Sequence, residues 1–248
     1  MTTLGAHLDA RPFALAMSSG FFGFFAHAGV LCALDEAGLR PIRLSGSSAG
    51  ALVTGAYAAG VAPRDLAEAL LGLDRAAFWD PSPGAGLLRG ARFRARLESL
   101  LPVDDFAACS TPLAVSAFDA RRRRTRVLDA GRLVPAIYAS CAVPLLFQPI
   151  RHEGGLLVDG GVRDRPGLAG MPRDIPVLHH HLASRSPWRR QSDPALTPPK
   201  RDGLVALVLP DLPRSGPFAL DAGRAAYEMA YDRARRALDR EVGEIVVG

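Results

Sequence analysis

The stretch Leu44–Gly50, which reads LSGSSAG, contains a serine in the setting of a catalytic nucleophile. Ser48 stands at the centre of a G-x-S-x-G pattern, between Gly46 and Gly50. In a nucleophile elbow, such a serine occupies a tight strand-to-helix turn, where flanking glycines tolerate strained backbone and nearby amides face a developing oxyanion. The same pattern also occurs in ordinary strand-to-helix turns, so the rest of the chain must supply a base and oxyanion donors.

Two arrangements could supply the base that takes the proton of the Ser48 hydroxyl. In a triad, Asp159 would orient one histidine of the run 179–181, of which only some can face one site, because neighbouring strand positions point to opposite faces. In a dyad, Asp159 would accept the proton directly, and the glycines at 160–161 would permit the close backbone approach. The residues alone leave both arrangements open.

Oxyanion donors are predicted in the glycine-containing loop 18–23, which reads SSGFFG. The loop follows the first predicted strand and leads into a helix, whose dipole favours negative charge near its N-terminus. The phenylalanines at 21, 22, 24 and 25 have two interpretations, ordinary core packing or the wall of a pocket for an acyl chain.

Apolar patterns place these residues at the ends of strands and helices. The run 13–17 predicts a buried strand before the loop, and 26–37 predicts a helix that ends at Gly38. A second strand at 42–45 runs into the elbow, and the small apolar residues 49–59 predict the helix behind it. Further helices are predicted at 63–73, 93–101, 132–140 and 221–240, strands at 113–118, 126–128, 156–158, 175–182 and 204–209, and a loop or edge strand at 143–150.

Length and composition favour one α/β domain over residues 1–248, since the chain is 48% hydrophobic and can bury a large core. The net charge is +5, but Lys200 is the only lysine among thirty basic residues, which indicates a composition bias. No nucleic-acid motif accompanies the charge, so no nucleic-acid partner is expected. Three cysteines without metal-ligand spacing favour a reducing compartment, and no metal or cofactor is expected.

Localisation is expected to be cytoplasmic, with membrane contact at the periphery at most. The apolar run 12–26 is interrupted by serines and glycines and makes a poor signal peptide, and no stretch reaches the roughly 20 apolar residues of a membrane span. The arginine run 121–124 is either a solvated hairpin tip or a contact for anionic lipid. The segment 184–203, rich in proline, serine and arginine, is predicted to be a flexible loop and is a candidate lid.

The chain resembles the patatin-like phospholipase family in five ordered segments over about residues 13–166. The segments are the loop Ser18–Gly23, then His27 with Gly29-Val30-Leu31, the elbow Gly46–Gly50, Ala139-Ser140-Cys141-Ala142-Val143-Pro144, and Asp159-Gly160-Gly161. This resemblance favours the dyad. It implies a patatin-type three-layer α/β fold, with a mainly parallel central sheet flanked by helices.

The resemblance also implies an activity and roles for residues. The protein would be a lipid acyl hydrolase acting on phospholipids or acylglycerols, with Ser48 as nucleophile, Asp159 as base and an acyl-serine intermediate. The oxyanion donors would be amides around Gly20, Phe21 and Ala49. His27 resembles a helix residue of the family with a structural role, bonding a backbone group beneath the loop. Its partners would be a lipid or ester substrate and, at most peripherally, an anionic membrane.

The loop departs from the family pattern, which has three glycines and a basic residue before the last glycine. Here Ser18 and Ser19 replace glycines and Phe22 stands at the basic position, which puts the geometry of the oxyanion loop in question. Two other functions therefore stay open. One is a generic carboxylesterase of small esters, and the other is a catalytically weak lipid- or membrane-binding protein of the same fold.

Overall fold

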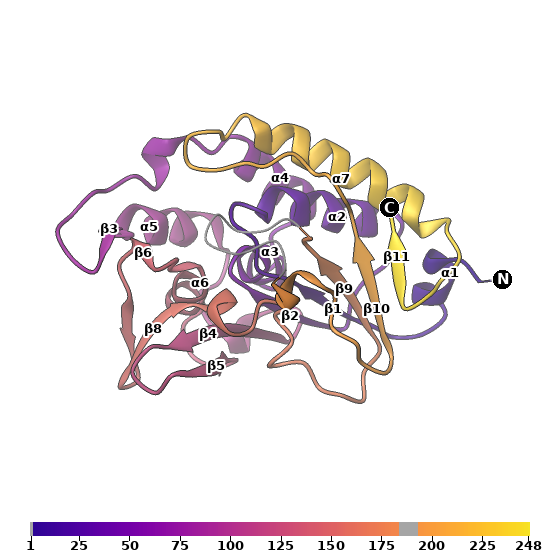
Figure 1. The fold of residues 1–248 in the computed structure, drawn as a ribbon, viewed down its shortest axis with the longest axis horizontal. Coiled ribbons are helices and arrows are strands. Elements are labelled where there is room, and N and C mark those ends of the chain that lie inside the picture. The colour runs from indigo at the N-terminus through magenta and orange to yellow at the C-terminus, as the bar shows by residue number, and fades with distance from the viewer. Residues whose placement is uncertain (1, 184–192) are drawn as a thin grey trace.

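The computed structural model describes residues 2–183 and 193–248, which form a nine-stranded sheet with long helices over one face (Figure 1). The strands of the sheet lie in the order β11-β10-β9-β1-β2-β4-β8-β7, and β5 pairs with the other edge of β4. The six strands from β11 to β4 are parallel, whereas β5, β8 and β7 are antiparallel to their neighbours. The strands are β1 Ala14–Met17, β2 Arg43–Ser47, β3 Gly86–Leu88, β4 Leu113–Asp119, β5 Arg124–Leu128, β6 Leu145–Phe147, β7 Ile150–His152, β8 Gly155–Asp159, β9 Val177–His181, β10 Leu204–Val208 and β11 Ile245–Val247, with β3 and β6 forming a separate parallel pair.

The helices follow the predicted apolar stripes. The α-helices are α1 Leu4–Asp9, α2 Phe24–Glu36, α3 Ala49–Ala58, α4 Pro63–Leu71, α5 Ala91–Leu100, α6 Leu133–Cys141 and α7 Ala222–Leu238, and the short 3-10 helices are η1 Arg75–Ala77, η2 Phe106–Ala108, η3 Gly160–Val162 and η4 Pro194–Leu196. Helix α2 is buried on all sides between Phe25 and Leu34, because α7 lies across its outer surface (Figure 1).

The sheet separates two apolar layers, as the alternation along β1 shows. Leu15 and Met17 belong to the large core beneath α2, α3 and α7, whereas Ala14 and Ala16 point to a smaller cluster that includes Met171. The α/β fold with three layers and a mainly parallel central sheet is therefore confirmed. The α-helices gather on the large-core side, and η4 lies on the other side with the segment around Met171.

Strand β4 brings together two strands that arrive from opposite directions. The end of β2 pairs Ser47 with Ser116, and the end of β8 pairs Asp159 with Ala117, the next residue of β4. Because β5 occupies the other edge of β4 at both positions, β2 and β8 meet head to head along a single edge. The residue after β2 and the last residue of β8 must therefore lie close together.

Several features differ from the sequence expectations or lie outside them. The strand before the elbow extends to Ser47, two residues beyond the predicted end, and the short elements α1, β3, β7 and β11 were not predicted. Of the predicted flexible loop 184–203, residues 184–192 lie outside the described residues, and 194–196 form η4. One domain over 1–248 stays a prediction. Among the described residues, none of the helices combines the length and the apolar character that crossing a membrane requires.

Candidate active site

The turn between β2 and α3 holds Ser48 in a strained conformation, with φ 52° and ψ −120°. Such backbone costs about 1–3 kcal/mol and persists only where the surroundings fix it. The flanking glycines are required by close approach: a Cβ on Gly50 would lie 2.1 Å from the Met17 carbonyl oxygen, and one on Gly46 would lie 2.5 Å from the Gly50 carbonyl carbon. The G-x-S-x-G pattern thus lets α3 start directly against β1 and β2.

The Ser48 hydroxyl donates a hydrogen bond to Asp159, with 2.6 Å between Oγ and Oδ2. The second carboxylate oxygen, Oδ1, accepts from the Gly161 amide at 2.8 Å. The Asp159 amide itself donates to the Ala142 carbonyl, so the backbone at the end of β8 is fixed as well. Both side chains are nearly buried, with Ser48 7% and Asp159 5% exposed. This geometry places a carboxylate where it can accept the hydroxyl proton without an intermediary.

Two neighbouring residues of α6 hold the backbone of the elbow. The Ser140 hydroxyl accepts from the Ser48 amide at 2.8 Å and donates to the Ser116 carbonyl of β4 at 2.6 Å. The Cys141 thiol donates to the Ser48 carbonyl at 3.1 Å. Both backbone polar groups of Ser48 thus have a side-chain partner on one helix, which accounts for the stability of its strained turn.

The histidines proposed for a triad have partners elsewhere. His179 Nε2 donates to the Pro166 carbonyl at 3.0 Å, and His181 Nε2 donates to the Leu196 carbonyl at 2.7 Å. His180 points to the opposite face of β9, where its Nδ1 lies 2.8 Å from Nδ1 of His27. Within residues 2–183 and 193–248, none of the three hydrogen-bonds to Ser48.

The pair His27 and His180 anchors the loop 18–23 from beneath. His27 Nε2 donates to the Ser18 carbonyl at 2.7 Å, and burial lowers the pKa of His27 to about 4. His27 is therefore neutral, its Nδ1 is an acceptor, and Nδ1–H of His180 is the donor. The predicted backbone bond of His27 beneath the loop is confirmed.

The loop 18–23 lies against Leu182 and lines the cavity that Ser48 also lines. A Cβ on Gly20 or Gly23 would come within 2.4 Å or 2.3 Å of Leu182 Cδ1, so a larger residue at either position would require the Leu182 side chain to shift. Gly20, Phe21 and Ala49, the predicted oxyanion donors, line the same cavity as Ser48. Ala49 is the first residue of α3, where amides have no partner inside the helix and the dipole favours negative charge.

An apolar cavity of about 860 Å³, its open mouth included, extends from Ser48. Three of the four phenylalanines in and after the loop, at 21, 22 and 24, line the cavity, while Phe25 of α2 is buried in the core and packs against Gly223 of α7. The interpretation as a pocket wall therefore holds for three of them. The other walls come from α4, α5 and the segment around Phe78, and they include Leu70, Leu73, Phe78, Leu97 and Leu100.

The sequence matches a known family over most of this site. The family model described as patatin-like phospholipase matches residues 15–170, which is more than half of the chain and includes both Ser48 and Asp159. The chain belongs to the patatin-like phospholipase family.

Relatives of this patatin-like chain include bacterial and fungal proteins. An uncharacterized NTE family protein of Mycobacterium bovis is 30% identical over 190 residues, which cover 74% of this chain and 53% of that protein. Lysophospholipase nte1 of Emericella nidulans is 28% identical over 181 residues, covering 68% of this chain and 12% of that protein. The chain thus spans about half the length of the Mycobacterium bovis protein and a much smaller share of the fungal protein. The crystal structure of VipD from Legionella pneumophila has the same fold, with a TM-score of 0.54, 15% identity and coverage of 92% of this chain and 67% of that one.

Sequence reasoning missed several parts of this patatin-like site. Ser140 and Cys141 lay in a segment that was matched to the family but given no role, although a serine in an apolar helix indicates a specific hydrogen bond. The cavity walls on α4 and α5 lie in the helices predicted at 63–73 and 93–101, where apolar periodicity cannot distinguish pocket lining from core packing.

Proposed function

We propose that the chain is a lipid acyl hydrolase that cleaves carboxylic esters through an acyl-Ser48 intermediate. The hydrogen bond from Ser48 Oγ to Asp159 Oδ2 carries this proposal, because it joins a strained elbow serine directly to a buried carboxylate. The apolar cavity that begins at Ser48 supports a long acyl chain as the part of the substrate that is bound.

In the proposed reaction, Ser48 Oγ attacks the ester carbonyl carbon while its proton passes to Asp159. The carbonyl oxygen becomes an oxyanion, which the amides of Gly20, Phe21 and Ala49 stabilise. The tetrahedral intermediate then expels the alcohol, which takes the proton from Asp159 and leaves the acyl group on Ser48. Water attacks the acyl-enzyme with Asp159 again as base, and the fatty acid leaves. Every proton taken up by Asp159 is returned within one cycle.

Phospholipase A-like or acylglycerol activity is favoured over a carboxylesterase of small esters by the apolar lining of the cavity. Beside Ser48, its lining includes Leu70 of α4, Leu73 just after that helix and Leu100 of α5, all of them apolar side chains. Each methylene buried there contributes about 0.8 kcal/mol. We therefore expect kcat/KM on nitrophenyl esters to rise from butyrate to longer acyl chains, whereas a flat or falling series would favour the small-ester alternative.

The dyad is tested by covalent labelling with a fluorophosphonate probe, which reacts with activated serines. We expect the wild type to be labelled and to hydrolyse a long-chain ester, and Ser48→Ala to lose both properties. Asp159→Asn should lose at least about 100-fold in kcat, the lower end of the contribution that one acid–base group makes. His181→Gln is the matched control, because glutamine retains a donor for the Leu196 carbonyl and the variant should keep its activity.

Two results would contradict the proposal. Equal labelling of the wild type and Ser48→Ala would exclude Ser48 as the nucleophile, and loss of activity in His181→Gln with retention in Asp159→Asn would assign the base to the histidines. A folded wild type that binds lipid vesicles without labelling or acyl release would instead support the catalytically weak lipid-binding alternative.

A further inference from the structure

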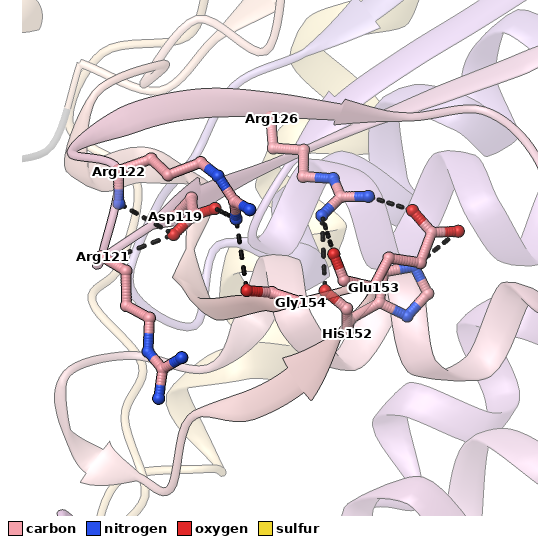
Figure 2. Close-up of polar contacts among 7 residues, drawn as sticks. All are labelled: Asp119, Arg121, Arg122, Arg126, His152, Glu153 and Gly154. Atoms are coloured by element: carbon pink, nitrogen blue, oxygen red, sulfur yellow. Dashed lines mark hydrogen bonds and ion pairs between the residues drawn. The ribbon is translucent and has the colours of Figure 1, made fainter.

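The turn between β4 and β5 carries exposed arginines that stand at the same end of the sheet as Ser48. Strand β4 continues for three residues beyond Ser116, the partner of Ser47, before it reaches Asp119. At about 3.3 Å per residue, the turn lies about 10 Å beyond the register of the nucleophile. The hairpin of β7 and β8 ends beside it, and Arg122 and Arg126 of the first hairpin contact the second (Figure 2).

Two arginines of this hairpin, Arg122 and Arg126, form ion pairs with acidic side chains of the protein. Buried Asp119 accepts from the amides of Arg121 and Arg122 and forms an ion pair with the Arg122 guanidinium at 2.8 Å. The Arg122 side chain and these amides lower the pKa of Asp119 to about 2, so its charge fixes the turn at all ordinary pH values. Arg126 pairs with Glu153 of the second hairpin (Figure 2).

Four other arginines form what we call the arginine tip, namely Arg121, Arg123, Arg124 and Arg163. All four are exposed, and among residues 2–183 and 193–248 no acidic side chain forms an ion pair with any of them. The Arg121 side chain extends away from the contacts of the hairpin (Figure 2).

Arg163 links the arginine tip to the proposed catalytic base. Its Nη1 donates to the Arg123 carbonyl at 2.8 Å, and it follows η3, the 3-10 helix that begins directly after Asp159. Val162, the last residue of η3, is 41% exposed. An exposed apolar side chain therefore lies in the chain between buried Asp159 and cationic Arg163.

We propose that the arginine tip is a docking surface for anionic phospholipid membranes and presents the lipid surface to the end of the sheet that holds Ser48. This inference rests on the proposed function, since it supplies the surface from which the substrate would come. Guanidinium groups form paired hydrogen bonds with phosphate oxygens. The fixed turn carries three of the unpaired charges, and Arg163 is joined to it through the Arg123 carbonyl. Exposed Val162 suits contact with a lipid interface better than contact with a nucleic acid.

Vesicle binding tests the docking surface independently of catalysis. The background is Ser48→Ala, which cannot consume the vesicles under the proposed mechanism. We expect it to co-sediment with vesicles of phosphatidylcholine containing phosphatidylglycerol, less with pure phosphatidylcholine, and less as salt is added. Adding Arg121→Gln, Arg123→Gln and Arg124→Gln should lower the partition coefficient roughly 100-fold, since each basic residue near an anionic surface contributes about a fivefold factor.

The matched control removes the same charge from a distant helix. Arg224, Arg235 and Arg236 are exposed on α7, and their replacement by glutamine should change the partition coefficient little. An equal loss in both triple variants, equal binding to neutral and anionic vesicles, or tip-dependent binding to nucleic acid without vesicle binding would overturn the proposal.

Activity assays separate failure of docking from failure of the proposed function. With Ser48 present, the tip variant should hydrolyse a short soluble ester at the wild-type rate, which also shows that it is folded, and should lose activity on anionic vesicles. Equal activity of wild type and tip variant on vesicles would contradict docking while leaving the hydrolase intact. Charge-specific binding by a wild type that hydrolyses nothing would contradict the hydrolase while leaving docking intact.

Discussion

At the scale of single residues, the proposed site depends on side chains that fix a backbone rather than on reactive groups alone. Ser140 joins the Ser48 amide to the Ser116 carbonyl, and thereby connects the elbow to β4, the strand that also positions Asp159. We infer that Ser140 is a positioning residue, because it contacts the backbone of Ser48, the proposed nucleophile, and not its hydroxyl.

Replacing Ser140 by alanine should affect stability and catalysis together. The change leaves a buried amide and a buried carbonyl without this partner, which costs about 1–3 kcal/mol. A small displacement of Ser48 should lower kcat roughly 10- to 100-fold with little change in KM. Urea unfolding and the rate of fluorophosphonate labelling measure the two effects.

Ser110→Ala is the control for that experiment. The Ser110 hydroxyl donates to the Ala58 carbonyl at 3.1 Å at the end of α3, so its loss removes one partly buried hydrogen bond far from the elbow. The control should lower the unfolding free energy by about 1 kcal/mol and leave kcat unchanged. A Ser140→Ala enzyme with wild-type kcat and labelling rate would refute the positioning role.

At the scale of elements, the junction of β2 and α3 leaves no room for a side chain at Gly50. Gly50→Ala would place a Cβ 2.1 Å from a backbone oxygen of β1, which cannot move without separating strand and helix. We expect a loss of about 3 kcal/mol or more in unfolding free energy, together with loss of serine labelling. Thermal unfolding and labelling are the measurements.

Gly38→Ala distinguishes crowding from backbone strain. Gly38 has φ +74° and no atom within 4 Å of its potential Cβ, so alanine there meets only the conformational penalty of about 1–2 kcal/mol. It should remain active. If Gly50→Ala were no more destabilised than Gly38→Ala, the close approach of α3 to β1 would not be the reason for the second glycine of the elbow.

The elements were more predictable from sequence than their contacts. Buried strands such as 13–17 and helices such as 26–37 follow from apolar periodicity, and the glycines of the elbow identify the turn between them. Apolar periodicity does not indicate which residues of distant segments contact each other. The contact of Ser140 with Ser48, and the cavity walls formed by α4 and α5, arise from packing between segments far apart in the chain. For the same reason, the sequence does not show whether a histidine of the run 179–181 reaches Ser48. Only the structure shows where each ring points.

At the scale of the whole molecule, buried histidines should make the fold sensitive to acid. Burial lowers the pKa of His27 to about 4 and that of His179 to about 3, and it also lowers the pKa values of His180 and His181. The unfolded chain binds protons at these histidines near pH 6.5, where the folded protein does not. The stability is therefore complete above about pH 6.5 and falls as the pH decreases toward the folded-state values.

Urea unfolding between about pH 7 and pH 5 measures this dependence. Each buried histidine contributes a slope of up to about 1.4 kcal/mol per pH unit at the acidic end of that window. His179→Gln, which keeps a donor for the Pro166 carbonyl, should reduce the slope by up to one histidine's contribution. Equal stability at both ends of the window would show that the histidines are not held neutral in the folded protein.

The meeting of β2 and β8 on one edge of β4 has a consequence for how this architecture tolerates change in chain length. Ser48 and Asp159 are 111 residues apart in sequence, yet their separation is set by adjacent positions of a single strand. Insertions in the connections before or after β4 can therefore accumulate without moving Ser48 relative to the Asp159 carboxylate. A one-residue slip of β8 along β4 would instead turn Asp159 to the other face of the sheet. Loops are thus free to diversify, while three residues of β4, Ala117–Asp119, are not free to shift.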